Sequence, residues 1–163
     1  MDLARIQSGS RKISLEPVNL YQSVKETLYK VFGLFKPEVS VTTSWSDPEM
    51  EVYADPALLN TVLESLLSNA AKYTESGEVR IKAESTNRLL KVLITDTGIG
   101  MDPEEIDLVF DRFSRSDEVF STLGHGLGLT IAQTLIRQME GEIGVTSIKG
   151  KGSTFWFTLL RVT

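Results

Sequence analysis

The chain has 163 residues, of which 41% are hydrophobic and 24% are charged, and its net charge is -5. This length suits one domain with a substantial core. The acidic balance argues against a nucleic-acid binder, and the absence of cysteine excludes disulfides and cysteine-based metal sites. No apolar run approaches the roughly 20 residues of a membrane-spanning helix, and the first five residues lack the apolar core of a signal peptide.

The amino-terminal segment predicts a helix end, a short strand and a first complete helix. Leu3 and Ile6 recur among polar residues as in the last turns of a helix, which we expect to continue from a longer parent protein. Residues 13–15 alternate as in a short strand. Asn19 is a suitable N-cap, with Gln22 at the capping-box position, and apolar residues follow at helical spacing. These are Leu20, Val24, Leu28, Val31 and Phe35.

A strand pair and a long helix are predicted next. Residues 39–45 predict a strand, and residues 50–53 predict a strand that returns after a turn. Asp55 followed by Pro56 is a strong helix start, because a capping side chain precedes proline at the first helical position. We expect this helix to run to about Tyr73.

The second half of the chain alternates between strands and helices. The predicted elements are strands at 79–83 and 89–95, a helix from Asp102, a helix over 126–140 that ends at Gly141, and strands at 142–147 and 153–161. Helices thus gather among strands that are mostly joined by hairpins, which indicates an α+β sandwich.

The helix from Pro56 to Tyr73 carries a polar flank beside its apolar stripe. At 100° per residue, Ser65, Asn69 and Lys72 fall together, about 130° from the centre of that stripe. An asparagine oxygen suits magnesium, and a lysine suits the phosphates that magnesium accompanies. A solvated helix flank is the alternative reading of the same residues. The stripe itself contains Leu59, Val62, Leu63, Leu66 and Ala70.

Three glycine-rich segments suggest turns that approach a ligand. Residues 96–100, Asp-Thr-Gly-Ile-Gly, follow an apolar strand, and the Asp96 carboxylate can accept a hydrogen bond from an exocyclic amine such as that of adenine. Residues 124–129 open a helix, where free N–H groups and the helix dipole favour phosphate. They lack the βαβ context of a dinucleotide fingerprint. Residues 150–155 alone indicate a hairpin turn.

Taken in order, these segments resemble the ATP-binding fold of two-component sensor histidine kinases, which DNA gyrase, Hsp90 and MutL share. The resemblance runs from about residue 55 to residue 157. The matching segments are the N box at 66–74, the glycine boxes at 96–100, 124–129 and 150–155, and the phenylalanine box at 110–113. It implies a two-layer α/β sandwich of the Bergerat (GHKL) type, in which helices cover one face of a mixed, mostly antiparallel sheet.

The resemblance also implies site residues for Mg-ATP. Asn69 would bind magnesium, Lys72 would contact the phosphates and Asp96 would bind the adenine amine. Arg115, two residues beyond the phenylalanine box, matches the arginine that such kinases direct at the γ-phosphate, so Arg115 and Lys72 are the expected catalytic residues. Residues 114–123 would form a lid over ATP. The other expected ATP contacts are Tyr73, Gly98, Ile99, Gly100, Gly124, His125, Gly126, Leu127, Gly128, Leu129 and Thr154.

The chain departs from the family pattern in two ways. Ser65 stands where family members usually have a second asparagine, and its shorter side chain is a metal ligand only if it reaches magnesium, directly or through water. The phosphoacceptor histidine is missing, because the single histidine, His125, lies inside the second glycine box. The acceptor is therefore expected on a dimerisation domain outside this chain.

The expected organisation and partners follow from this resemblance. Residues 1–14 would be the end of a dimerisation-domain helix with a linker, and residues 15–163 the catalytic domain. The expected partners are that dimerisation domain and the receiver domain of a response regulator, in a homodimeric parent protein. We expect neither a nucleic-acid partner nor a membrane segment in this chain. The domain would work in the cytoplasm, and a membrane anchor on the parent protein stays open.

Three other functions remain to be separated from histidine kinase activity. An ATPase of the gyrase type needs a glutamate base four residues before the magnesium asparagine, whereas Glu64 lies five before and is turned about 140° from Asn69. A nucleotide-binding scaffold without catalysis is favoured only by Ser65. A protein serine kinase of the anti-sigma type shares the fold.

Overall fold

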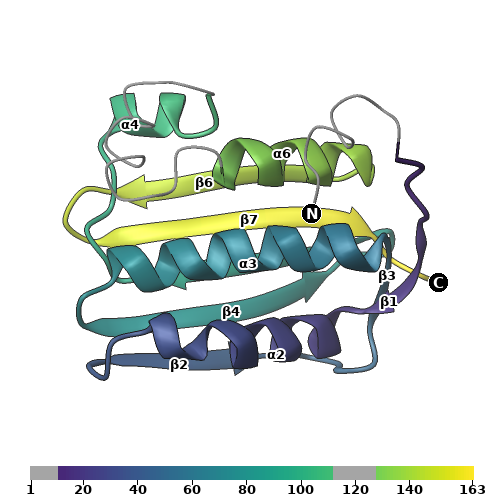
Figure 1. Ribbon diagram of the computed structural model, residues 1–163, viewed down its shortest axis with the longest axis horizontal. Helices are drawn as coiled ribbons and strands as arrows, with labels where there is room; N and C mark the ends of the chain where they lie inside the picture. The colour runs from purple at the N-terminus through teal and green to yellow at the C-terminus, as the bar shows by residue number, and fades with distance from the viewer. Residues whose placement is uncertain (1–10, 112–127) are drawn as a thin grey trace.

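The structure is a computed structural model, and it describes residues 11–111 and 128–163. Helices α2 (Leu20–Val31), α3 (Pro56–Tyr73) and α6 (Gly128–Gln138) lie side by side over one face of a five-stranded sheet (Figure 1). The sheet order is β2-β4-β5-β7-β6. This arrangement confirms the predicted α+β two-layer sandwich. The strands are β2 (Val39–Ser44), β4 (Gly77–Ser85), β5 (Leu89–Asp96), β6 (Glu142–Ile148) and β7 (Gly152–Leu160).

The sheet is mixed and mostly antiparallel, as expected. Strand β2 pairs parallel with β4, whereas β4–β5, β5–β7 and β7–β6 are antiparallel pairs. Every second side chain of β5 and β7 is buried beneath the helices, which is the period of two that a sheet with one covered face requires. Phe157 lies at the centre of that buried face with no exposed surface.

Two details of the first strands were predicted wrongly. Residues 13–15 form no strand, and the first strand, β1 (Glu16–Asn19), begins where that strand was expected to end. Strand β3 (Glu51–Ala54) does not return beside β2, because it pairs with β1 in a separate two-stranded sheet. Alternation along a segment predicts a strand but does not predict which strand it pairs with. Strand β2 pairs with β4, which follows the long helix in the chain.

Helix α2 begins at its predicted cap but ends earlier than its apolar pattern indicates. The Asn19 side chain accepts a hydrogen bond from the Gln22 backbone N–H at 2.7 Å. The Gln22 side chain donates to Glu26 instead of returning to Asn19, so only half of the expected capping box forms. A 3-10 turn, η1 (Phe32–Leu34), follows the helix, and Phe35 is buried beyond it.

The N-cap of helix α3, Asp55, also holds the segment near the amino terminus. Asp55 accepts hydrogen bonds from the backbone N–H groups of Ala57 and Leu58, as its sequence predicts. The same carboxylate accepts bonds from the Arg11 guanidinium and the Ser14 backbone N–H. The predicted apolar stripe of α3 is buried throughout.

The two helices near the carboxyl half have distinct ends. Helix α4 (Pro103–Leu108) starts with a full capping box between Asp102 and Glu105. Beyond α6 the positive φ of 63° belongs to Glu140, while Gly141 donates to the Ile136 carbonyl. Gly141 is required for a different reason from the one predicted, since a Cβ there would lie 2.0 Å from the Thr158 carbonyl oxygen.

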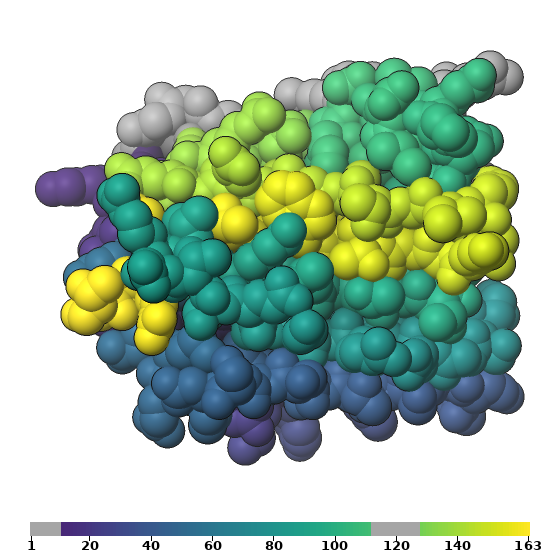
Figure 2. Space-filling view, turned by 180° about the vertical axis from the view of Figure 1, so that it is seen from behind, coloured from purple at the N-terminus to yellow at the C-terminus, as the bar shows by residue number. Residues whose placement is uncertain are grey.

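No described helix covers the opposite face of the sheet, called the uncovered face below, and Figure 2 shows β4, β5 and β7 at this surface. Trp156 of β7 lies across Gly144 of β6, where a Cβ would come within 2.4 Å of the indole. The Lys91 ammonium lies 4.3 Å from the centroid of the same ring. On the helix side, Trp45 packs edge-on against Tyr21 of α2 with ring centroids 5.4 Å apart. Within the described ranges, no helix is long and apolar enough to cross a bilayer.

Candidate nucleotide-binding site

A buried carboxylate marks the end of β5. Asp96 is only 6% exposed, and its Oδ1 accepts hydrogen bonds from the backbone N–H groups of Gly98 at 2.9 Å and Ser153 at 3.3 Å. Burial raises the pKa of this carboxyl, while the two backbone bonds partly oppose the rise. In the described part of the chain no donor is bonded to Oδ2, so this oxygen can accept a hydrogen bond from a ligand.

The glycines after Asp96 are needed by the protein itself. A Cβ on Gly98 would lie 2.1 Å from the Tyr73 carbonyl oxygen, at the end of α3. Gly100 has a φ of 63°, and a Cβ there would lie 2.1 Å from the Ile148 carbonyl oxygen. These contacts fix the loop after β5 between α3 and the β6–β7 hairpin. We expected both glycines to clear space for a base. In the structure they are required because a side chain would collide with the backbone of Tyr73 or Ile148.

Ile99 contributes its backbone to the same loop. Its N–H donates to the Tyr73 carbonyl at 3.2 Å, and its own carbonyl accepts from the Gly150 N–H at 2.7 Å. The Ile99 side chain is 55% exposed. A large apolar side chain held in solvent beside the Asp96 loop is a suitable surface for the flat face of a base.

The polar flank of α3 is buried instead of solvated. Asn69 is 4% exposed, because α6 packs beside α3 on this flank. Its Oδ1 is buried and has no hydrogen-bond partner among the described residues. Buried polar atoms are nearly always paired, so an unpaired amide oxygen indicates a missing ligand. A hard cation such as magnesium is a ligand that an amide oxygen can hold. The residues present thus fit the metal that the sequence predicts.

Ser65 faces the first residue of α6. A Cβ built on Gly128 would come within 2.9 Å of Ser65 Oγ, so the hydroxyl lies against the start of that helix. The N-terminal turn of α6 is where backbone N–H groups favour phosphate. Glu64 lies on another side of α3, because its carboxylate forms an ion pair with Lys30 of α2. The prediction that Glu64 is turned away from the Asn69 flank is confirmed.

Lys72 and Tyr73 occupy the last turn of α3. Burial lowers the pKa of the Lys72 ammonium, and within the described ranges no carboxylate pairs with it. Burial also raises the pKa of the Tyr73 phenol, which keeps it neutral. A half-buried ammonium without a carboxylate partner is suited to bind an external anion.

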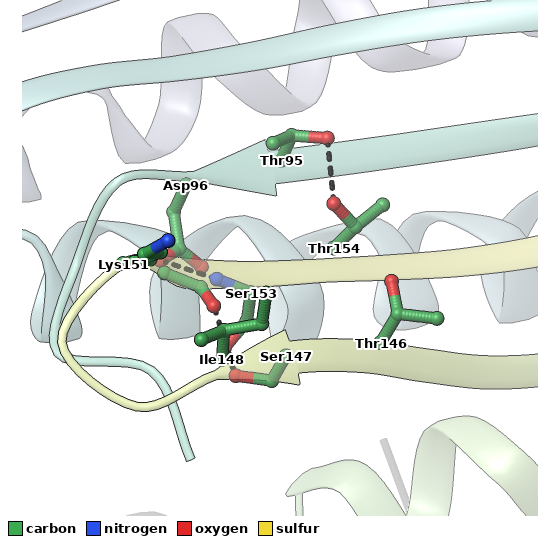
Figure 3. A pocket seen from close by; sticks show the side chains of 9 residues that line it. Thr95, Asp96, Thr146, Ser147, Ile148, Lys151, Ser153 and Thr154 are labelled. Carbon is green, nitrogen blue, oxygen red and sulfur yellow. Dashed lines mark hydrogen bonds between the residues drawn. The ribbon is translucent and has the colours of Figure 1, made fainter.

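Thr154, a predicted ATP contact, lies on the opposite face of the sheet from Asp96 and Ser153. It alternates with Ser153 and Phe155 and lies on the uncovered face of the sheet, where its Oγ1 contacts Thr95 Oγ1 at 3.0 Å (Figure 3). With Thr146 it lines a shallow cleft of about 270 Å³ at the end of β5, β6 and β7. Asp96 and Ser153 also line this cleft, whereas Asn69 and Lys72 do not.

Ser153 is the residue that the sequence reasoning missed. It is 8% exposed, it pairs with Asp96 across β5 and β7, and its N–H bonds the Asp96 carboxylate. Side chains of a strand alternate between the two faces of the sheet. Because Asp96 lies under the helices, the register between β5 and β7 decides whether Ser153 or Thr154 lies beside it on that face. That register is not written in either strand alone.

Several predicted residues lie outside the described part of the chain. They include the lid at 114–123 and part of the phenylalanine box at 112–113. Of that box, Phe110 packs edge-on against Phe155, and its carbonyl accepts from the Thr130 hydroxyl of α6 at 3.1 Å. Leu129 is buried in the core. The predicted site residues outside the description are Arg115, Gly124, His125, Gly126 and Leu127.

Several sensor kinases are similar to this chain. LuxQ of Vibrio harveyi, an autoinducer 2 sensor kinase/phosphatase, is 34% identical over 98% of this chain and 20% of its own length. The sensor histidine kinase GacS of Pseudomonas protegens is 34% identical over 98% of this chain and 18% of its own length. The chain thus spans a fifth or less of the length of these curated relatives.

Two solved structures share the fold at useful identity. Full-length ShkA in complex with AMPPNP superposes with a TM-score of 0.84 at 28% identity, covering 98% of this chain and 34% of that chain. The mycobacterial sensor histidine kinase MprB superposes with a TM-score of 0.78 at 25% identity, covering 90% of this chain and 97% of that chain.

The family match covers most of the site described above. Residues 54–163 match the family described as "Histidine kinase-, DNA gyrase B-, and HSP90-like ATPase". This span begins just before the cap of α3 and includes Asn69, Asp96 and Ser153. Because it covers more than half of the chain, the chain belongs to the family of histidine kinase-, DNA gyrase B- and HSP90-like ATPases.

Proposed function

We propose that this chain is the catalytic domain of a two-component sensor histidine kinase, which binds Mg-ATP and donates the γ-phosphoryl group to a histidine on a dimerisation domain. The observation that carries the proposal is the Asp96 carboxylate, buried at the end of β5 with one oxygen bonded by two backbone N–H groups. Such a carboxylate, with its other oxygen available, recognises an exocyclic amine. The bound nucleotide analogue named for ShkA supports the same ligand class.

Each end of the nucleotide has a matching group in the chain. Asp96 accepts from the adenine amine, and Ile99 covers the base. The Lys72 ammonium and the first N–H groups of α6 neutralise the phosphates. Asn69 Oδ1 fits magnesium, which supplies charge neutralisation on the phosphate oxygens when bound. Ser65 is too short to replace a second amide ligand, and we assign it a contact through water.

Phosphoryl transfer asks the protein mainly for positioning and charge neutralisation. The bond from the γ-phosphorus to the bridging oxygen breaks, a bond to the acceptor imidazole nitrogen forms, and ADP leaves. Lys72 stays with the phosphates through this exchange, and Arg115 is assigned to the γ-phosphate. The chain contributes neither the acceptor nor the base that assists it, so the reaction needs a second domain.

The partners of the site follow from this division of labour. We assign residues 1–14 to the end of a dimerisation-domain helix with its linker, and residues 15–163 to the catalytic domain. The parent protein is proposed to be a homodimer that passes the phosphoryl group to a receiver domain. We place this domain in the cytoplasm, where ATP is available, whether or not the parent protein carries a membrane anchor.

Calorimetry with ADP tests the binding step. We expect ADP to bind, and to bind more tightly with magnesium than with EDTA. Binding without any effect of magnesium would remove Asn69 from the metal site. If ADP bound neither with magnesium nor with EDTA, the proposed function as a whole would be contradicted.

Transfer from labelled ATP tests the reaction. The chain is mixed with its dimerisation fragment, and acid-labile label on that fragment is the expected result, because phosphohistidine is labile in acid. Acid-stable label would indicate a serine kinase. ADP binding without transfer would indicate a nucleotide-binding scaffold, and release of free phosphate without any acceptor would indicate an ATPase.

A further inference from the structure

A row of three polar side chains crosses the sheet below the helices at its glycine-rich end. Asp96, Ser153 and Ser147 are consecutive cross-strand neighbours on β5, β7 and β6 (Figure 3). Ser153 and Ser147 hydroxyls lie 2.8 Å apart, and the Ser153 N–H bonds the Asp96 carboxylate. Ser147 is therefore connected to the carboxylate that the proposed function assigns to adenine, although it lies two strands away.

The hydrogen bonds of Ser147 fix the direction of its proton. A carbonyl oxygen can only accept, so the 2.9 Å contact between Ser147 Oγ and the Gly152 carbonyl uses the single hydroxyl hydrogen of Ser147. Ser147 Oγ then acts as an acceptor for its other neighbours. It accepts from the Met101 backbone N–H at 2.8 Å and from the Ser153 hydroxyl at 2.8 Å.

This arrangement also fixes the polarity of Ser153. Because its hydrogen points at Ser147, the Ser153 hydroxyl presents only lone pairs to anything beside it. The adjacent Asp96 carboxylate, when ionised, also presents only lone pairs. The two side chains together form an acceptor-only edge. Such an edge attracts a donor, as in the 6-amino group of adenine, and repels the 6-carbonyl oxygen of guanine or hypoxanthine.

Ser147 also anchors the loop that carries the second donor to Asp96. Gly98 N–H bonds Asp96 at the beginning of this loop, and Met101 N–H bonds Ser147 at its end. Loss of the Ser147 hydroxyl would free both the end of the loop and the proton of Ser153. The freed proton could then point at a ligand carbonyl.

We propose that Ser147 is a positioning residue for base selection, which makes the Asp96–Ser153 edge accept hydrogen bonds only and so selects 6-aminopurine over 6-oxopurine nucleotides. The inference rests on the proposed function, because it takes Asp96 as the group that binds the base. Ser147 acts through Ser153 and Met101, and it does not touch the nucleotide.

The test is calorimetry with ADP and inosine diphosphate, whose base carries a carbonyl in place of the amine. Variants Ser147→Ala and Ser147→Cys are compared with wild type, and Ser147→Cys has a slightly larger side chain of the same shape with a weak donor and acceptor. The matched control is Thr146→Ala, since Thr146 directly precedes Ser147 in β6 and its side chain lies on the uncovered face. Circular dichroism verifies that each variant is folded.

The expected result is a change in selectivity. Both Ser147 variants should bind ADP about tenfold more weakly, a loss of the size that one to two neutral hydrogen bonds give. Their affinity for inosine diphosphate should stay equal or rise, while Thr146→Ala matches wild type for both ligands. An unchanged ratio of the two affinities, or an equal loss for both, would overturn the inference and leave the proposed function standing. Failure of wild type to bind either nucleotide would overturn both.

Discussion

The two ends of the candidate site are built differently. At the base end, Asp96 is bonded by Gly98 and Ser153, and the surrounding loop is fixed by backbone contacts to α3 and the β6–β7 hairpin. At the phosphate end, Asn69 Oδ1 is buried and unpaired within the described ranges, and Lys72 has no carboxylate partner there. At the first end, bonds within the protein hold the ligand-binding carboxylate in position, whereas at the second the ligand-binding groups have no such partners among the described residues.

This difference separates pre-organisation from charge matching. A base carries no charge, so its recognition depends on a few hydrogen bonds held at fixed positions, and strands and glycine contacts supply that rigidity. Phosphates and magnesium carry strong charges that compensate for desolvation when they bind. The protein therefore keeps polar groups at that end without internal partners, at some cost to its own stability.

The largest effect is expected where the base end is most rigid. Gly152 has a φ of 121°, and a Cβ there would lie 2.0 Å from the Asp96 carbonyl oxygen. Gly152→Ala should lower the free energy of unfolding by about 3 kcal/mol or more, from left-handed strain and overpacking together. Gly150 is the control, because its φ is 80° but no atom lies within 4 Å of a Cβ. Gly150→Ala should cost about 1 kcal/mol. Urea denaturation measures both, and equal losses would show that the contact with Asp96 is not rigid.

Asp96→Asn should separate binding from stability. The amide can still accept both backbone bonds, but it presents a donor where the adenine amine also donates, so ADP affinity should fall about 30-fold. Since burial raises the pKa of Asp96, its charge opposes folding at neutral pH, and the variant should melt at the same or a higher temperature. Calorimetry and thermal denaturation test the pair of outcomes. Near-normal affinity would contradict the adenine assignment.

Asn69→Ala probes the incomplete end. Removing an unpaired amide oxygen should leave the stability of the free protein nearly unchanged, whereas the gain in ADP affinity from magnesium, taken as about tenfold, should disappear. The control is Ser68→Ala, since among the described residues its hydroxyl bonds only carbonyls of its own helix, those of Glu64 and Ser65. Calorimetry with magnesium and with EDTA gives the ratio. A persistent magnesium effect in Asn69→Ala would place the metal elsewhere.

A smaller effect is expected from pH. The raised pKa of Asp96 means that the carboxyl takes up its proton in the folded state at a higher pH than the ordinary value of 3.8. As pH falls through that raised pKa, the acceptor for the adenine amine is lost and ADP affinity should decrease, by about twofold at the midpoint, where half of the carboxyl is protonated. The free protein gains stability over the same window, because protonation removes a buried charge. Asp96→Asn should lack both changes. Because the ADP phosphates titrate equally in both experiments, the difference between wild type and variant reports on Asp96 alone.

Much of the fold could be predicted because its signals are local. The cap and proline at the start of α3, its apolar stripe and the alternation of β5 all lie within single elements. The partners of β2 and β3 could not be predicted from alternation, since pairing depends on which strand lies alongside after α3 folds. The same limit explains why Ser153 was not predicted, because register between distant strands decides which side chain meets Asp96.

The site was predictable where chemistry and position coincide in one residue. Asp96 and Asn69 follow from their types and from their places at a strand end and on a helix flank. The burial of Asn69 could not be foreseen from α3 alone, because α6 provides the covering. The glycines were found for an incomplete reason, since their closest neighbours are the carbonyls of Tyr73 and Ile148. Ser147 gave no local signal, because its contacts come from two other segments.

The positions of the two tryptophans provide a spectroscopic tool. Trp45 packs on the helix side against Tyr21, and Trp156 lies on the uncovered side between Gly144 and Lys91. The chain has no other tryptophan. Each indole therefore emits from a different layer of the sandwich. In Trp156→Phe the remaining emission follows the α2 layer, and in Trp45→Phe it follows the strand layer, so two single-tryptophan proteins reveal whether the layers come apart together or in sequence.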